Sequence, residues 1–257
     1  MSFVDAVVAQ VQVLEVALYH AYARMEARTD SEALHDLRIN LRRIRSLLRP
    51  LRRIGGVALL NEAAAEVGKL TTPVRDLEVL IDELDQRGLP AQAKARKLIL
   101  HSSYGSIVES STIQQFFARV DEWPSAFREA GRGGELRQIR KTISKRLHQQ
   151  VRRLAAALAD PHYDRHQLRI LVKRVRYTAD AYPELSPISA QAAASLKVVQ
   201  SALGAWHDHY QWCLRARLEQ DLQPLQHQWQ VAATSALMNA EVALLQLAGL
   251  LAENSQG

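Results

Sequence analysis

The feature that most constrains the fold of this chain is the recurrence of apolar residues at steps of three and four. The spacing is clearest in two stretches, Val4, Val7, Val8, Val11, Leu14 and Leu18, and Leu37, Leu41, Ile44, Leu48 and Leu51. Because an α-helix turns 100° per residue, such steps place these side chains on one face. The sequence contains no alternating strand pattern bounded by hairpin turns. It therefore predicts an all-α protein of roughly eight to ten helices.

Short runs of Gly, Pro and polar residues divide this helical pattern into segments. They are Thr29–Ser31, Gly55–Gly56, Gly88–Pro90, Gly131–Gly134, Asp160–Pro161 and Pro183–Pro187. Ser31 and Asp164 are predicted N-caps, because each is a short polar residue just before an apolar run. Pro73 is expected to break or kink its helix, since proline removes an amide donor and restricts the residue before it.

The composition favours a globular protein with an anionic partner. The 257 residues carry a net charge of +6, with 26 Arg and only 7 Lys, and 47% of them are apolar. The guanidinium fork of Arg matches carboxylate and phosphate oxygens, and the apolar fraction argues against a disordered basic tail. The sequence contains no run of 18 apolar residues, no signal-peptide pattern and no Cys besides Cys213. We therefore expect a cytoplasmic protein without a disulfide or a membrane partner.

An internal repeat organises the chain. Two segments 131 residues apart share the pattern His-x2-Arg-x3-basic-Arg-x-Arg, one beginning at His35 and the other at His166. Asp76 and Asp208 follow these histidines at nearly equal separations of about 41 residues. Such matches predict two related helical halves, about 1–125 and 132–252, joined near Pro124–Gly134.

On helices, the repeats form rows of basic side chains beside the apolar stripes. The first row is His35, Arg38, Arg42, Arg45 and Arg49; the second is His166, Arg169, Lys173 and Arg176, with Arg43 and Arg174 at the flanks. A third row is Arg137, Lys141, Lys145, His148 and Arg152. From Gly131 to Tyr177 there are 13 Arg or Lys but only three acids, which favours a counter-anion. If the two repeats face each other, they line a cationic groove or pore suited to a linear polyanion.

These repeats resemble the CHAD domain, the conserved histidine α-helical domain. The resemblance also rests on Val74–Leu77 and on Gln200-x2-Leu203-Gly204-x3-Asp208; it spans roughly residues 2–251 and departs from the family at His207. It implies a single CHAD domain over 1–257, made of two four-helix bundles related by pseudo-twofold symmetry. It also implies a basic central surface that binds inorganic polyphosphate. Family members are often fused to a triphosphate-tunnel (CYTH) domain and are associated with polyphosphate granules; here we expect a stand-alone, cytoplasmic version.

The residues expected to contact polyphosphate are the cations and histidines of the rows, together with Arg75. They are His35, Arg38, Arg42, Arg43, Arg45, Arg49, Arg75, Lys141, Lys145, Arg152, His166, Arg169, Lys173, Arg174 and Arg176. Arg and Lys would contact phosphate oxygens, histidine would donate hydrogen bonds, and Asp36, Asp76 and Asp208 would orient the cations. No nucleophile, Gly-rich phosphate loop or carboxylate cluster stands out in the sequence. We therefore expect a binding protein rather than an enzyme, with no cofactor and no metal.

Two other functions fit parts of the pattern. Arg-rich helices also bind nucleic-acid backbones, and weak binding of this kind is expected of a polyphosphate binder. The dipeptides His35–Asp36 and His207–Asp208, with His20 and Asp76, imitate the metal ligands of HD phosphohydrolases. Against the second alternative, Arg38 and Arg42 share a helix face with His35 and would repel a divalent cation. Chain-length preference, oligomeric state, a role for a divalent cation and the role of His207 are left open by the sequence.

Overall fold

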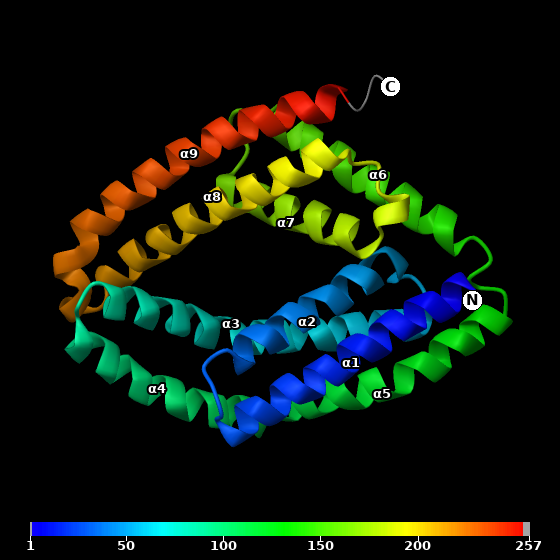
Figure 1. Cartoon of the computed structure of the whole chain (residues 1–257), viewed down its shortest axis with the longest axis horizontal. Helices are drawn as coiled ribbons and strands as arrows, with labels where there is room; N and C mark the ends of the chain where they lie inside the picture. Colours follow the sequence, from blue (N-terminus) through cyan, green and yellow to red (C-terminus); the bar gives the residue numbers. More distant parts are fainter. Residues whose placement is uncertain (1, 254–257) are drawn as a thin grey trace. The chain divides into compact units, whose positions relative to one another are not determined.

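The computed structural model describes residues 2–253, and all regular structure in this range is helical (Figure 1). Nine α-helices and three short 3-10 segments follow one another there, as the apolar periodicity predicts. The α-helices are α1 (Phe3–Ala27), α2 (Ala33–Leu48), α3 (Gly55–Gln86), α4 (Pro90–Val108), α5 (Ser111–Arg132), α6 (Ile139–Leu158), α7 (Arg165–Ala181), α8 (Ala190–Ala216) and α9 (Gln226–Glu253). The 3-10 segments are η1 (Arg49–Leu51), η2 (Pro183–Leu185) and η3 (Gln220–Leu225).

The chain divides into two compact units, and each is described by itself. Unit 1 ends at Thr142 and unit 2 begins at Ile143, so the division falls inside α6. The segment expected to join the halves, Pro124–Gly134, instead covers the last part of α5 and the turn after it. Pro124 itself is a buried helical residue. It stays in the helix because Trp123 and Phe127 pack into the core of unit 1 on either side of it.

Unit 1 contains five helices, one more than the expected four. Its α4 and α5 follow each other end to end, with a change of direction between them in Figure 1. The two helices are separated at Glu109 and Ser110, where the Ser110 hydroxyl accepts a hydrogen bond from the Ile113 amide at 3.3 Å and so begins a new helix. The apolar stripes of the sequence analysis lie inside: Val7, Val8, Val11, Leu14 and Leu18 of α1 are buried, as are Leu37, Leu41, Ile44, Leu48 and Leu51.

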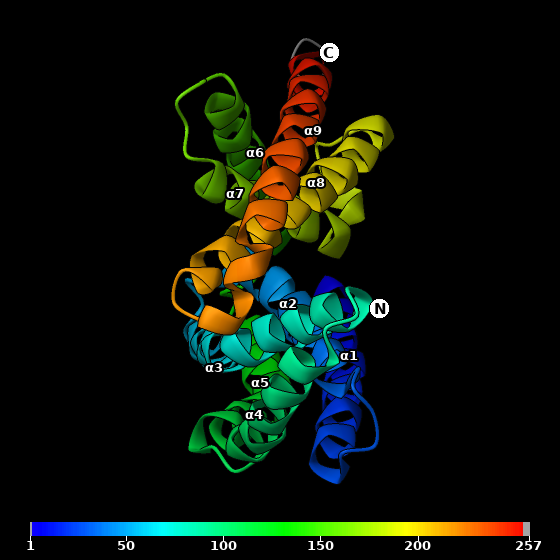
Figure 2. The same cartoon turned by 90° about the vertical axis from the view of Figure 1, so that its left-hand side faces the viewer.

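Unit 2 gathers α6, α7, α8 and α9 around a single apolar core. All four helices contribute buried residues to it, among them Leu154, Val172, Leu196 and Leu247. Helices α8 and α9 are the longest of the four and lie side by side, as Figures 1 and 2 both show. The basic row of α7 therefore lies on a helix whose apolar face is held by an apolar core.

Of three local predictions, the N-cap at Ser31 and a helix break at Pro73 are wrong, and the N-cap at Asp164 is confirmed. Ser31 is not the N-cap of α2. An N-cap at Ser31 would start the helix at Glu32, but α2 begins at Ala33, and Glu32 occupies the cap position without a side-chain hydrogen bond. Helix α3 continues through Pro73 without ending; Pro73 is exposed, and Val67 and Val74 hold the helix to the core on both sides of it. Asp164 does cap α7, since its carboxylate accepts from the Gln167 amide at 2.8 Å.

Two helical segments are long and apolar enough to cross a membrane by length and composition alone. They are α1 and Gln220–Glu253, and only 28% of the most apolar window in each is buried. Core helices of soluble proteins meet the same criterion. The exposed apolar surface of these helices therefore needs an explanation of its own.

Candidate functional site

The first basic row lies along α2, beside the stripe that α2 buries in unit 1. His35, Arg38, Arg42, Arg45 and Arg49 are all half-buried, whereas Arg43 is exposed on the flank. The apolar stems of such side chains pack against the bundle while their charged ends reach its surface. The helical spacing thus brings five of the predicted residues together on one side of α2, and it places Arg43 apart from them.

Arg38 connects this row to α3. Its guanidinium donates to the Gly68 carbonyl at 3.2 Å, to the Thr71 hydroxyl at 2.5 Å and to the Thr72 hydroxyl at 3.2 Å. Gly68 has no side chain, and Arg45 Nη1 lies only 3.7 Å from where a Cβ would be. The row therefore packs closely against one turn of α3, which holds the Arg38 guanidinium in a defined place.

Several cations meet at this contact between α2 and α3. Burial lowers the pKa of Arg38, and the nearby charges of Arg42 and Arg75 lower it further, while Asp76 and Glu78 act in the opposite direction. An arginine stays charged in proteins even so. The cost of crowding these charges would fall if an anion bound among them.

Arg75 is held by two residues that the sequence analysis did not identify. It donates to Glu78 at 2.7 Å, and the other oxygen of this buried carboxylate accepts a hydrogen bond from Tyr104 at 2.5 Å. Burial and the bond to Glu78 raise the pKa of Tyr104, so its hydroxyl stays protonated and remains a donor. Glu78 follows Arg75 by three residues on α3, and this i,i+3 spacing was the signal that could have revealed the pair.

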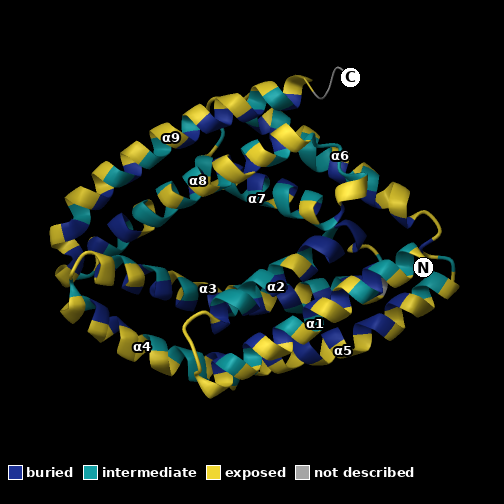
Figure 3. Cartoon of the chain, in the orientation of Figure 1, coloured by how far each residue is buried: buried dark blue, intermediate teal, exposed yellow. Residues whose placement is uncertain are grey.

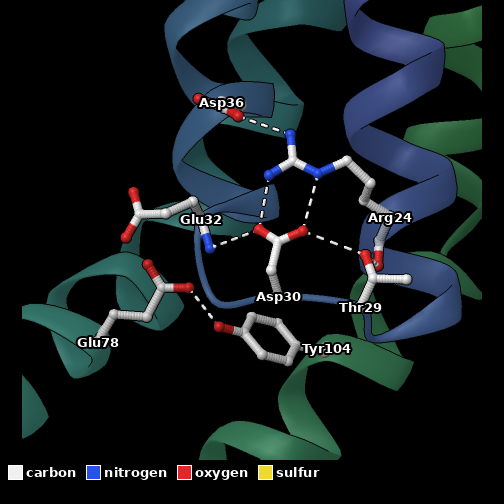
Figure 4. A network of polar contacts seen from close by, with 7 residues as sticks. All are labelled: Arg24, Thr29, Asp30, Glu32, Asp36, Glu78 and Tyr104. Atoms are coloured by element: carbon white, nitrogen blue, oxygen red, sulfur yellow. Dashed lines mark hydrogen bonds and ion pairs between the residues drawn. The ribbon is translucent and has the colours of Figure 1, made fainter.

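The start of α2, where His35 lies, is held by a second polar network (Figure 4). Arg24 of α1 donates to both carboxylate oxygens of Asp30, at 2.9 and 2.6 Å, and to Asp36 at 2.6 Å. These bonds lower the pKa of Asp30 to about 2. Asp36 is thus committed to an arginine of α1, and the network fixes the first turn of α2 on which His35 is carried.

The second basic row lies on α7 in unit 2. Arg169, Lys173 and Arg176 are half-buried there, whereas His166 and Arg174 are exposed. The Arg176 guanidinium lies 5.2 Å from the centre of the Tyr177 ring and 3.7 Å from Asp180. In turn the Tyr177 hydroxyl accepts a hydrogen bond from Gln200 of α8 at 3.0 Å. The Tyr177–Gln200 bond thus connects the end of the α7 row to α8.

His207 of α8 completes this group, although the sequence analysis assigned it no role. Its ring centre lies 5.1 Å from that of His166. Burial lowers the pKa of His207 to about 4, and the charges of Arg169, His166 and Lys173 add to the effect. Its buried Nδ1 atom has no hydrogen-bond partner among the residues that the structure describes. At neutral pH, a neutral imidazole thus lies among three residues of the α7 row.

The predicted residues of α6 lie elsewhere on the surface. Lys141, Lys145 and Arg152 are exposed. Helix α6 buries Ile143, Leu147 and Leu154, and at 100° per residue the basic side chains lie on its opposite face. These cations point away from the residues that α6 buries, so their part in one common site stays a prediction.

Comparison with known proteins places this architecture in a family. The sequence profile of the CHAD domain matches residues 12–218. The chain belongs to the CHAD-domain family. This CHAD domain is also similar to the crystal structure of the CHAD domain from the plant Ricinus communis, with a TM-score of 0.64 and 18% sequence identity. That similarity covers 97% of this chain and 91% of the plant chain, and at such low identity it concerns the fold. No curated protein matches the sequence.

The family match confirms the resemblance that the two His-x2-Arg repeats indicated, and the similar crystal structure confirms the all-α fold. The CHAD family is associated with polyphosphate binding in general. Which residues of this chain would contact polyphosphate is a separate question, and the geometry of the two rows bears on it.

Proposed function

We propose that this CHAD domain binds inorganic polyphosphate through the basic rows of α2 and α7. The observation that carries the proposal is the gathering of Arg38, Arg42 and Arg75 at the contact between α2 and α3. Phosphate oxygens match the guanidinium fork, and a chain of phosphates can contact successive turns of a basic row. Binding rather than catalysis is proposed, since charge and position suffice to hold a polyanion.

In unit 2, the α7 row supplies basic residues of the same kind. There His166, Arg169 and Lys173 surround His207, whose imidazole can accept a proton when a phosphate lies nearby. Recognition of this kind is electrostatic and depends on salt, because condensed counterions are released on binding. Such binding would bring the protein to polyphosphate granules in the cytoplasm.

The hydrolase alternative is disfavoured by what surrounds the His35–Asp36 dipeptide. Asp36 pairs with Arg24 at 2.6 Å, and Arg38 and Arg42 follow on the same helix. A divalent ion would have to displace an arginine from Asp36 and then sit beside further cations. The same residues that would repel a metal ion favour a phosphate.

Calorimetric titration tests the proposal directly. Long-chain polyphosphate, double-stranded DNA and triphosphate are compared at matched phosphate concentration and physiological salt. We expect polyphosphate to bind at least tenfold more tightly than DNA per phosphate. Equal binding of all three would reduce the rows to a general cationic surface, and no binding of polyphosphate would refute the proposal.

A matched pair of variants locates the binding surface. The first replaces Arg38, Arg42, Arg169 and Lys173 by Ala; the second replaces the exposed residues Arg128, Arg132, Arg217 and Lys94 by Ala, which removes the same charge elsewhere. We expect the row variant to lose polyphosphate binding by about 100-fold or more, whereas the control changes by less than about threefold. Similar losses in both variants would show that net charge, and not the rows, determines binding. Circular dichroism verifies that both variants retain their helices.

A further inference from the structure

Helix α9 has a second apolar face, opposite the one that it buries in unit 2. The buried face carries Trp229, Ala240, Leu244 and Leu247, among others. On the other side, Val231, Met238, Val242 and Leu245 have exposed fractions of 57%, 67%, 58% and 75%. Figure 3 shows exposed residues along the length of this helix. A helix that serves only its own bundle needs one apolar stripe, so the second one requires a partner.

The spacing of the exposed face is that of a coiled-coil seam. We define the α9 seam as Val231, Ser235, Met238, Val242, Leu245, Gly249 and Ala252, all of which are exposed. Successive members are separated by alternating steps of four and three residues over 21 positions. This period of 3.5 keeps the residues facing a neighbouring helix as the two helices wind around each other. The partner that fits the seam is therefore another α-helix.

The seam also carries no formal charge. Between Gln226 and Glu253 the only Asp, Glu, Lys or Arg is Glu241. Glu241 points to its own unit, where Arg165 Nε lies 2.5 Å from its carboxylate. Because the seam has no charged side chain, neither a polyanion nor a highly charged protein could form ion pairs on this face. A second copy of this chain, by contrast, brings an equally uncharged seam, so no like charges meet at the contact.

The shape of the seam suits an antiparallel pair. In that orientation, centred on Val242, Met238 of one copy lies nearest Leu245 of the other, and Ser235 lies nearest Gly249. The larger residues thus meet near the middle of the seam, and the small ones let the two helices approach closely towards its ends. A groove of about 400 Å³ at the Gly249 end is lined by Ser195, Val198, Gln246, Gly249, Leu250 and Glu253. A Cβ built on Gly249 would meet nothing within 4 Å. This open end is where the antiparallel copy would bring its Val231 or Met238.

We propose that two copies of this chain associate through the α9 seam, antiparallel and around a two-fold axis near Val242. The same seven residues then serve both copies, as a two-fold interface requires. The pairing does not depend on polyphosphate, so it stands or falls independently of the proposed function.

Light scattering and sedimentation measure the association in the full chain without polyphosphate. The parent is expected to be dimeric at micromolar concentration. The double substitution Met238→Glu and Leu245→Glu introduces charges at exposed positions and should raise the dimer dissociation constant at least 100-fold with unchanged helicity. The matched control is Val13→Glu with Val16→Glu on α1, where both valines have exposed fractions of 70%. This control should leave the dimer intact.

Cross-linking tests the orientation. With a short bifunctional thiol reagent, Val242→Cys should link two copies because residue 242 lies near the two-fold axis. Val231→Cys should not, since 22 residues, or about 33 Å of helix, would separate the two thiols. The native Cys213 is buried, and the parent chain gives the background.

Three outcomes would overturn the proposal. A parent chain that stays monomeric at about 100 μM would show that the seam does not pair with itself. A dimer that survives the two glutamates would place the interface elsewhere. Monomers that float with uncharged phosphatidylcholine vesicles, and lose this binding in the double variant, would assign the seam to a lipid surface.

Discussion

The two units carry the same basic motif but hold it by different means. In unit 1, Arg38 donates to three oxygens of α3, and Arg75 is joined to the buried Glu78 and Tyr104. In unit 2, the row of α7 rests on a helix of an apolar core, and its neighbour on α8 is the neutral His207. One row is therefore positioned by ion pairs and hydrogen bonds to α3, while the other lies beside a histidine of α8 whose pKa is lowered by burial.

The residue opposite each row explains this difference. Thr71 follows Gly68 by three residues, just as His207 follows Gly204. The short Thr71 hydroxyl accepts from Arg38 and donates to the Val67 carbonyl at 2.8 Å, so it is satisfied within unit 1. The larger imidazole of His207 instead lies among the cations of α7, and its buried Nδ1 has no partner among residues 2–253. Equal spacing thus leads to a hydrogen-bonded contact in unit 1 and to a contact with a lowered histidine pKa in unit 2.

The largest effect is expected from removing the buried carboxylate of unit 1. Glu78→Ala leaves both Arg75 and Tyr104 without their acceptor, and it should lower the free energy of unfolding of unit 1 by about 3 kcal/mol. Urea unfolding, monitored by amide hydrogen exchange, measures the free energies of unfolding of the two units separately. The counterpart in unit 2 is Glu241→Ala, whose half-exposed pair with Arg165 should contribute less than about 1 kcal/mol. Equal effects in the two variants would contradict the contrast between buried and exposed polar contacts.

A smaller effect is expected at the contact between α2 and α3. Arg38→Ala removes three hydrogen bonds but leaves Thr71 bonded to Val67, so unit 1 should lose about 1–2 kcal/mol of stability. Thermal unfolding measures the change. Arg174→Ala in unit 2 is the control, because this arginine is exposed on the flank of its row and should cost less than about 0.5 kcal/mol. An unchanged melting temperature for Arg38→Ala would mean that the row is not fixed by α3.

The smallest effect concerns the pH dependence of unit 2. The pKa of His207 is about 4 in the folded chain, below the ordinary value of 6.5, so the unfolded state binds the extra proton between these values. Its contribution to stability is therefore complete above pH 6.5 and is lost as the pH falls towards 4. After screening by solvent, the loss should amount to about 1 kcal/mol. Unfolding of unit 2 at pH 7 and pH 4.5 measures it.

His207→Gln isolates the contribution of this residue. The variant should lack the acid-dependent loss in unit 2, while His209→Gln at a half-buried position of the same helix would retain it. If polyphosphate occupies the α7 row, its charge raises the pKa of His207, and binding to the parent should tighten as the pH falls from 7 to 5. A parent chain whose stability is unaffected by acid would show that folding does not lower the pKa of His207.

Much of this arrangement could be read from the sequence. The apolar period predicted the buried stripes of α1 and α2, and the His-x2-Arg repeats identified the family and both basic rows. Local signals were less reliable where packing opposes them. Pro73 lies inside α3 because its exposed side of the helix can lose one hydrogen bond while the core holds the rest. The break at Ser110 has no Gly or Pro, and only its capping bond marks it.

The sequence by itself determined the helical class, the family and the repeated rows, because periodicity and motif spacing are properties of the chain. Only the tertiary structure decided which side chains of other helices meet those rows. Glu78, Tyr104 and His207 acquire their roles from helices packed against each other, and burial then sets the pKa values of Tyr104 and His207. The same holds for α9, whose two apolar faces look alike in sequence until packing buries one and leaves the seam exposed. Burial and long-range contact depend on distances in space, which spacing along the chain does not contain.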